Sequence, residues 1–238
     1  METSESAEAA MRITDHPNVL KLLDVRDDAD FKYLILEICI GTVRNYIDGD
    51  EKFTGKMPSE IEALWQMADG LAYIHSKDIV HRDIKPDNHP PTQPTGSSST
   101  NSGAKGTRIF YAPEYLRLED KTLSPEVKKT IRADKSIDIF SLGGLFFNYI
   151  TKKSPYNHLF ATPKKQYYSI DDFTSDVTTN IRNGKKFLKD NGLPSGHYAF
   201  KMIDGMTKAD SKDRLGLNEK KHVSNPETVI EILKKETK

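Results

Sequence analysis

The sequence predicts an α+β fold in which a small sheet near the N-terminus is followed by a helical body. Two strand-like runs lie within the first 40 residues, and four helical patterns come after residue 59. The run at 136–150 is apolar nearly all round, which is typical of a helix buried on every side. At 238 residues, the chain is long enough to bury a sizeable core.

The two strands are predicted from apolar runs that contain aromatic and β-branched residues. FKYLILEICI (31–40) indicates a buried strand, and VLKLLDV (19–25) indicates a weaker strand before it. The polar stretch RDDAD (26–30) separates the two runs, so they are expected to form a hairpin. A short helix rich in Ala and Glu is expected at 4–14.

The helical body is predicted from the spacing of apolar residues. Leucine, methionine, alanine and isoleucine recur at helical intervals within 60–77, and similar patterns occupy 196–209 and 225–236. For the last helix, Asn225 is the expected N-cap and Pro226 is expected in the first turn.

The composition indicates which cellular compartment the chain suits and which classes of binding partner are not expected. Thirty-five basic residues balance thirty-five acidic ones, so nothing draws the chain toward nucleic acid or an anionic membrane. The single cysteine, Cys39, forms no internal disulfide and suits a reducing compartment. The start, METSESAEAA, is no signal peptide, and no apolar run approaches the roughly 20 residues that a membrane span needs. We therefore expect a cytoplasmic protein.

The strongest motif is HRDIKPDN at 81–88. It resembles the His-Arg-Asp-x-x-x-x-Asn catalytic loop of protein kinases, in which the Asp accepts the proton of a substrate hydroxyl. The resemblance implies Asp83 as the catalytic base and Asn88 as a ligand of Mg²⁺. Lys85 would neutralise charge on the transferred phosphoryl group, and the Asp-x-Lys form favours Ser or Thr substrates. His81 and Arg82 would be structural.

Further segments follow in the order of that family. HPNVLKLLDV (16–25) is similar to the segment before the fourth strand, and YLILEIC (33–39) to the fifth strand and hinge. The resemblance implies ATP as the bound nucleotide. Leu36 would be the gatekeeper residue, and the backbone of Glu37 and Cys39 would face adenine.

Three later positions carry structural roles in the family. GTRIFYAPE (106–114) resembles the end of an activation segment, and DIFSLG (138–143) the start of the buried central helix. Asp138 would hold the backbone of the catalytic loop, and Arg214 would pair with Glu114.

The resemblance implies a protein-kinase-like fold with a mostly helical C-lobe and a reduced N-lobe of one helix and two strands. Residues 1–40 would be the N-lobe remnant and hinge, and 41–238 the C-lobe. Within the family, HPNV, LEIC followed by TVRNYI, GLAYIHSKDIVHRDIKPDN and DIFSLG most resemble the kinase domain of the stress-sensor kinase/endoribonuclease of the unfolded-protein response. This resemblance covers about 14–88 and 106–225. We expect neither the sensor, membrane span nor nuclease of that family here.

Two departures from the family bear on catalysis. The fifteen residues before His16 hold no glycine, so the Gly-rich loop and the strand lysine that clamp ATP are expected to be absent. Between Asn88 and Gly106 stand seventeen residues, 89–105, with three Pro, seven Ser/Thr and no Asp. This composition indicates a disordered linker in place of the Asp-Phe-Gly region.

Three interpretations remain open. The chain is a Ser/Thr kinase that transfers phosphate poorly or not at all, a catalytically dead pseudokinase scaffold, or a fragment from an incomplete gene model. The expected partners are a protein substrate or a binding protein, with a homodimer left open, and neither nucleic acid nor a membrane is expected.

Overall fold

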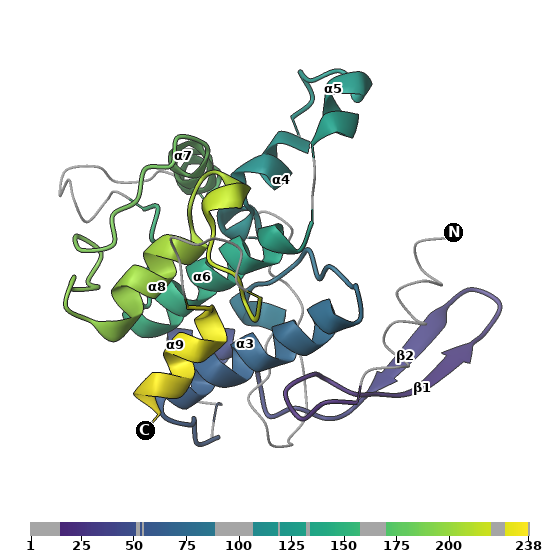
Figure 1. Ribbon diagram of the computed structural model, residues 1–238. Coiled ribbons are helices and arrows are strands. Elements are labelled where there is room, and N and C mark those ends of the chain that lie inside the picture. The colour runs from purple at the N-terminus through teal and green to yellow at the C-terminus, as the bar shows by residue number, and fades with distance from the viewer. Residues whose placement is uncertain are drawn as a thin grey trace.

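The computed structural model describes residues 15–50, 53, 55–88, 107–118, 120–131, 134–157, 170–219 and 227–237. Within these ranges a hairpin precedes a helical body (Figure 1). The elements, with η for 3-10 helices, are β1 (Leu22–Asp27), β2 (Lys32–Leu36), α2 (Val43–Asp48), α3 (Glu60–Ser76), η1 (Pro86–Asn88), η2 (Thr107–Phe110), α4 (Pro113–Leu118), α5 (Pro125–Thr130), α6 (Lys135–Thr151), α7 (Ile170–Arg182), α8 (Tyr198–Met206), η3 (Ser211–Asp213) and α9 (Val229–Glu236). The predicted α+β order is confirmed. The helix expected at 4–14 and the linker expected at 89–105 lie outside the described residues.

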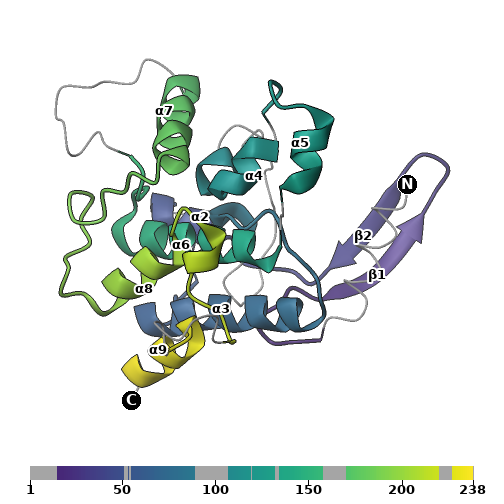
Figure 2. The same cartoon turned by 45° about the horizontal axis from the view of Figure 1, so that its top comes forward.

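The central element of the body is α6. Fourteen of its residues are buried, from Ser136 to Tyr149. Figures 1 and 2 both place it among α3, α8 and α4, and the largest buried apolar cluster joins it to α3, α8 and α9. A second cluster joins α6 to α4 and α7. The prediction of a helix buried on every side is confirmed, because neighbours cover its whole circumference. No helix in the described ranges is both long and apolar enough to cross a bilayer.

The C-terminal helix begins later than predicted. Thr228 is the N-cap of α9, and its side chain accepts a hydrogen bond from the N–H of Glu231, whose carboxylate accepts from the N–H of Thr228 in return. This capping box satisfies two backbone donors that a helix start otherwise leaves exposed. The prediction of Asn225 as the N-cap is therefore wrong. Asn225 lies outside the described residues.

The predicted hairpin is confirmed, but the prediction that 31–40 is a buried strand is wrong. β1 and β2 pair antiparallel, with an irregularity between Leu22 and Asp24. Phe31 and Ile38 are each 66% exposed, beyond the two ends of β2. Figures 1 and 2 show the hairpin projecting from the helical body, so in the described chain its apolar side chains have little to pack on.

The arm that leads into the hairpin is anchored on α3. His16 stacks on the ring of Tyr73 with centroids 4.7 Å apart, and its Nε2 lies 3.3 Å from a carboxylate oxygen of Asp69. The side chain of Asn18 donates to the same oxygen at 2.9 Å. A Cβ on Gly70 would lie only 2.3 Å from the carbonyl oxygen of Asn18. Glycine at this position therefore lets the arm lie directly against the helix.

Candidate active site

The candidate catalytic loop is held by one buried carboxylate from the start of α6. Asp138 is 1% exposed. Its Oδ2 accepts a hydrogen bond from the N–H of His81 at 2.7 Å, and its Oδ1 accepts from the N–H of Arg82 at 2.8 Å. The Nε2 of His75, at the end of α3, lies 2.9 Å from Oδ2. Three polar partners offset the cost of burying this charge.

The same contacts hold a strained backbone. Arg82 has a φ of 66°, in the left-handed region that a side chain other than glycine rarely adopts. Such a conformation costs on the order of 1 kcal/mol and persists only where the surroundings impose it. Here the Asp138 carboxylate accepts hydrogen bonds from the N–H groups of two successive residues, His81 and Arg82.

The two candidate catalytic side chains lie together. Lys85 Nζ is 2.8 Å from Oδ2 of Asp83, and the side chains are 21% and 42% exposed, respectively. Between them, Ile84 is 2% exposed and belongs to the main apolar cluster. His81 Nδ1 accepts a hydrogen bond from the N–H of Asp83 at 3.3 Å. The buried isoleucine anchors the loop, and its two polar neighbours are each partly exposed.

The loop continues into η1, which carries Asn88 at its end. The side chain of Asn88 lies outside the described part of the structure. Its neighbour Asp87 has a carboxylate oxygen 3.8 Å from Nε of Arg44, so an ion pair connects η1 to α2. Sequence reasoning did not identify Arg44, because nothing local indicates that α2 lies against this turn.

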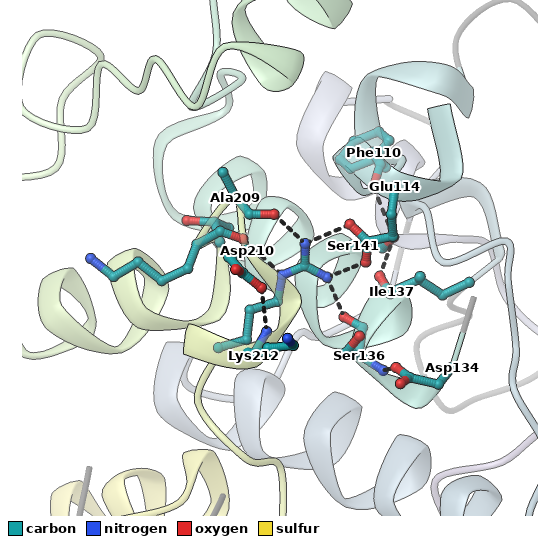
Figure 3. A network of polar contacts seen from close by, with 12 residues as sticks. Phe110, Glu114, Asp134, Ser136, Ile137, Ser141, Ala209, Asp210 and Lys212 are labelled. Atoms are coloured by element: carbon teal, nitrogen blue, oxygen red, sulfur yellow. Dashed lines mark hydrogen bonds and ion pairs between the residues drawn. The ribbon is translucent and has the colours of Figure 1, made fainter. Parts of the chain in front are cut away.

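Arg214 and Glu114 meet in the interior, although one hundred residues separate them. Nη1 of Arg214 donates to Oε1 of Glu114 at 2.6 Å, and Nη2 donates to Oε2 at 2.7 Å. Glu114 is in the first turn of α4, so this pair ties the end of the candidate activation segment to the C-terminal part of the chain. Figure 3 shows Glu114 of α4, Ser136 of α6 and Ala209 of the loop between α8 and η3 facing a common centre.

The guanidinium of Arg214 is 0% exposed, and each of its five N–H donors has an acceptor. The remaining three go to the carbonyl oxygens of Ser136 at 3.0 Å, Lys208 at 2.8 Å and Ala209 at 3.1 Å. Its central carbon also lies 5.0 Å from the ring centroid of Phe140. A lysine has neither the number of donors nor the planar fork that this site uses.

Two polar residues of this framework were missed by sequence reasoning. One is His75, whose only signal was its place at the end of an apolar helix shortly before His81. The other is Ser141, whose hydroxyl lies 2.8 Å from the carbonyl oxygen of Phe110 and 3.0 Å from that of Ile137. Ser141 therefore links α6 to η2, as Figure 3 shows. A small polar residue within an apolar helix gives no indication of its distant partner.

The three expected ATP-binding residues lie at the end of β2 and just after it. Leu36 is half-buried and pairs with Leu22 across the hairpin. The N–H of Glu37 donates to the carbonyl oxygen of Lys21 at 3.2 Å, which continues the hairpin pairing by one residue. Burial, and to a smaller extent the charge of Glu37, raise the pKa of the Cys39 thiol.

The expected site residues therefore fall into three groups. His81, Arg82, Asp83 and Lys85 form the loop that Asp138 holds. Glu114 and Arg214 form the buried pair. Leu36, Glu37 and Cys39 form the third group, at the end of β2 and on the linker between β2 and α2.

Comparison with known proteins agrees with this geometry. Residues 4–89 match the model of the protein kinase domain. The human serine/threonine-protein kinase/endoribonuclease IRE2 is 32% identical over 154 residues, which are 56% of this chain and 16% of that protein. The mouse ribosomal protein S6 kinase alpha-2 is 28% identical over 228 residues, which are 90% of this chain and 29% of that protein.

A solved structure shares the fold. The crystal structure of Rad53 1–466 in complex with AMP-PNP superposes with a TM-score of 0.64 at 21% identity, over 91% of this chain and 53% of that one. The chain thus spans only part of the length of each protein that it matches. The catalytic-loop motif, the match of residues 4–89 and the relatives are those of protein kinases, and the chain has a protein-kinase-like fold with a reduced N-lobe.

Proposed function

We propose that the chain is a protein kinase of the Ser/Thr class whose phosphoryl transfer from ATP is weak. The observation that supports this proposal is the assembled loop, in which Lys85 lies 2.8 Å from Asp83 and Asp138 holds the loop backbone. In this proposal Asp83 accepts the proton of a protein hydroxyl, and Lys85 offsets charge on the transferred group. Kinase relatives, and a neighbour whose structure holds AMP-PNP, favour ATP as the nucleotide.

The residues around the loop do not form a complete site for magnesium. A kinase holds its metal ions with the loop Asn and a second Asp that follows it. Asn88 is present, but residues 89–105 contain no Asp. The described residues also contain no group of three or more His, Cys, Asp or Glu that could hold a metal ion. The roles proposed for Asp83 and Lys85 therefore do not depend on a metal ion held by this chain.

The missing metal-binding Asp sets the expected rate of phosphoryl transfer. Phosphoryl transfer depends on positioning and on neutralising the charge of the phosphates. Loss of one preorganised charge-stabilising group typically lowers the rate about a hundred- to a thousandfold. We expect turnover reduced by at least this factor relative to a kinase with both ligands.

The test is a transfer assay with labelled Mg-ATP and matched peptides that differ only in Ser, Thr or Tyr as acceptor. We expect a slow signal on Ser and Thr that Asp83→Asn abolishes. The matched control is Asp78→Asn, because Asp78 is an exposed residue whose φ of 59° asparagine tolerates. Slow transfer that survives Asp83→Asn, or transfer to Tyr alone, would contradict the proposal.

A second candidate function is a catalytically inactive scaffold. The absence of Asp from residues 89–105 favours it. Thermal unfolding with and without Mg-ATP separates the two, because a ligand that binds the native state raises the melting temperature. A cooperative melt that Mg-ATP does not shift supports the scaffold, and transfer abolished by Asp83→Asn excludes it.

A further inference from the structure

The candidate catalytic loop has two ends, and α6 holds the first of them directly. Asp138, in the first turn of α6, accepts hydrogen bonds from the backbone where the loop begins. The loop ends in η1, which starts immediately after Lys85. η1 contacts α2 through the ion pair between Asp87 and Arg44. The placement of η1 therefore depends on what fixes α2.

The short helix α2 is fixed by contacts with the helical body. It has six residues, and a helix of this length is not stable in water by itself. Val43 in its first turn is 4% exposed and belongs to the main apolar cluster. The ring of Tyr46, one turn later, stacks on the ring of Tyr149 of α6, with centroids 5.1 Å apart. The last turn of α6 therefore carries part of the support of α2.

A single cation covers this pair of rings. Nζ of Lys152, the residue that follows α6, lies 3.7 Å from the ring centroid of Tyr46 and 5.0 Å from that of Tyr149. It also donates a hydrogen bond to the carbonyl oxygen of Tyr149 at 2.9 Å. Burial lowers the pKa of Lys152, against the raising effect of the Glu60 carboxylate. Partial burial strengthens the attraction between the ammonium and the rings, because less water screens it.

The backbone of Lys152 is strained as well. Its φ is 60°, in the left-handed region, where it caps the C-terminus of α6. Glycine is the usual residue at such a position, because a Cβ disfavours this conformation. Glycine would relieve the strain but would lose the contacts with both rings. The retained lysine therefore indicates a role for the side chain at this position.

We propose that Lys152 is a positioning residue for the candidate catalytic loop. Its ammonium holds Tyr46, and with it α2, against the end of α6, and Arg44 of α2 holds η1 through Asp87. α6 then fixes both ends of the loop, the first through Asp138 and the last through Lys152 and α2. The effect on the rate of phosphoryl transfer rests on the proposed function, whereas the effect on the structure of the loop does not.

Hydrogen exchange of the full chain without nucleotide tests the structural link. Lys152→Met removes the cation but keeps the length of the side chain and the left-handed backbone. We expect amides of α2 and η1 to exchange about tenfold faster in this variant. The amides of His81 and Arg82, which Asp138 holds, should keep the rate of the parent chain. Lys152→Arg retains a cation over the rings and should exchange like the parent. Lys129→Met, at an exposed lysine of α5, is the matched control.

A double-mutant cycle follows the link from α2 to the loop. Arg44→Met alone should speed the exchange of η1 by a similar factor. Adding Lys152→Met should then change η1 little further, because both substitutions interrupt the same link. Independent, additive effects of the two substitutions on η1 would overturn the proposal.

The transfer assay supplies the readout of activity. Lys152→Met should lower turnover about tenfold at an unchanged melting temperature, and Lys152→Arg should restore it. A parent chain that transfers no phosphate contradicts the proposed function, while hydrogen exchange still decides the positioning role. Unchanged exchange of η1 in Lys152→Met, or equal acceleration by Lys152→Arg or Lys129→Met, would overturn that role. If Lys152→Met does not fold, Tyr46→Leu removes the ring and tests the same contact with the same expected result.

Discussion

At the scale of single residues, the buried carboxylate of Asp138 has the largest structural role in the candidate site. It accepts two backbone N–H groups and lies within hydrogen-bond distance of His75. Hydrogen bonds to a buried charge contribute more than neutral ones, and an unsatisfied buried donor costs additional free energy. This one side chain therefore couples the stability of α6 to the shape of the loop.

We expect Asp138→Asn to lower the free energy of unfolding by about 3 kcal/mol, because one carboxamide oxygen cannot replace both carboxylate oxygens. Asp134→Asn is the matched control. Asp134 is an exposed N-cap one turn earlier, and asparagine caps helices equally well, so its effect should stay within about 0.5 kcal/mol. Denaturant titration measures both. Equal effects for the two variants would show that Asp138 has no special role.

At the scale of elements, two buried glycines within helices have opposite surroundings. A Cβ on Gly70 in α3 would lie 2.3 Å from a backbone oxygen of the hairpin arm. A Cβ on Gly144 in α6 would meet only the ring of Phe110, at 3.5 Å, which is an ordinary contact. Gly70 therefore serves the packing of the arm on the helix, whereas Gly144 has no such requirement.

We expect Gly70→Ala to destabilise the chain by about 1–3 kcal/mol, because the arm must move although alanine favours the helix. Gly144→Ala should be neutral or stabilising by up to about 1 kcal/mol, since it gains helix propensity without a clash. Thermal or denaturant unfolding of the pair measures the difference. A stabilised Gly70→Ala variant would mean that the arm does not lie against α3.

At the scale of the whole molecule, stability is unevenly distributed. The buried clusters of the body lie around α6, whereas no apolar side chain of β1 or β2 is buried. Regions with few buried contacts open locally at a lower free energy than the global unfolding.

Hydrogen exchange should therefore divide the chain into two parts. At a protein concentration at which the chain is monomeric, amides of β1 and β2 should exchange through local opening, well before those of α6. Amides in the middle of α6 should exchange only through global unfolding. Equal protection of hairpin and α6 under these conditions would be incompatible with this distribution.

The sequence by itself determined the α+β class, the hairpin and the long helices, because these depend on the local period of apolar residues. The sequence also predicted the catalytic loop, because the residues of that motif are contiguous. α6 is an example: an apolar circumference implies burial wherever the helix packs.

Only the tertiary structure decided the exposure of β2, the choice of Thr228 as the N-cap of α9, and the roles of His75, Arg44 and Ser141. Each depends on contacts between positions distant in sequence, or on the choice between competing local caps. An apolar strand carries the same pattern whether or not a neighbour covers it. The burial of β2 is therefore a property of what surrounds the strand, and not of its own residues.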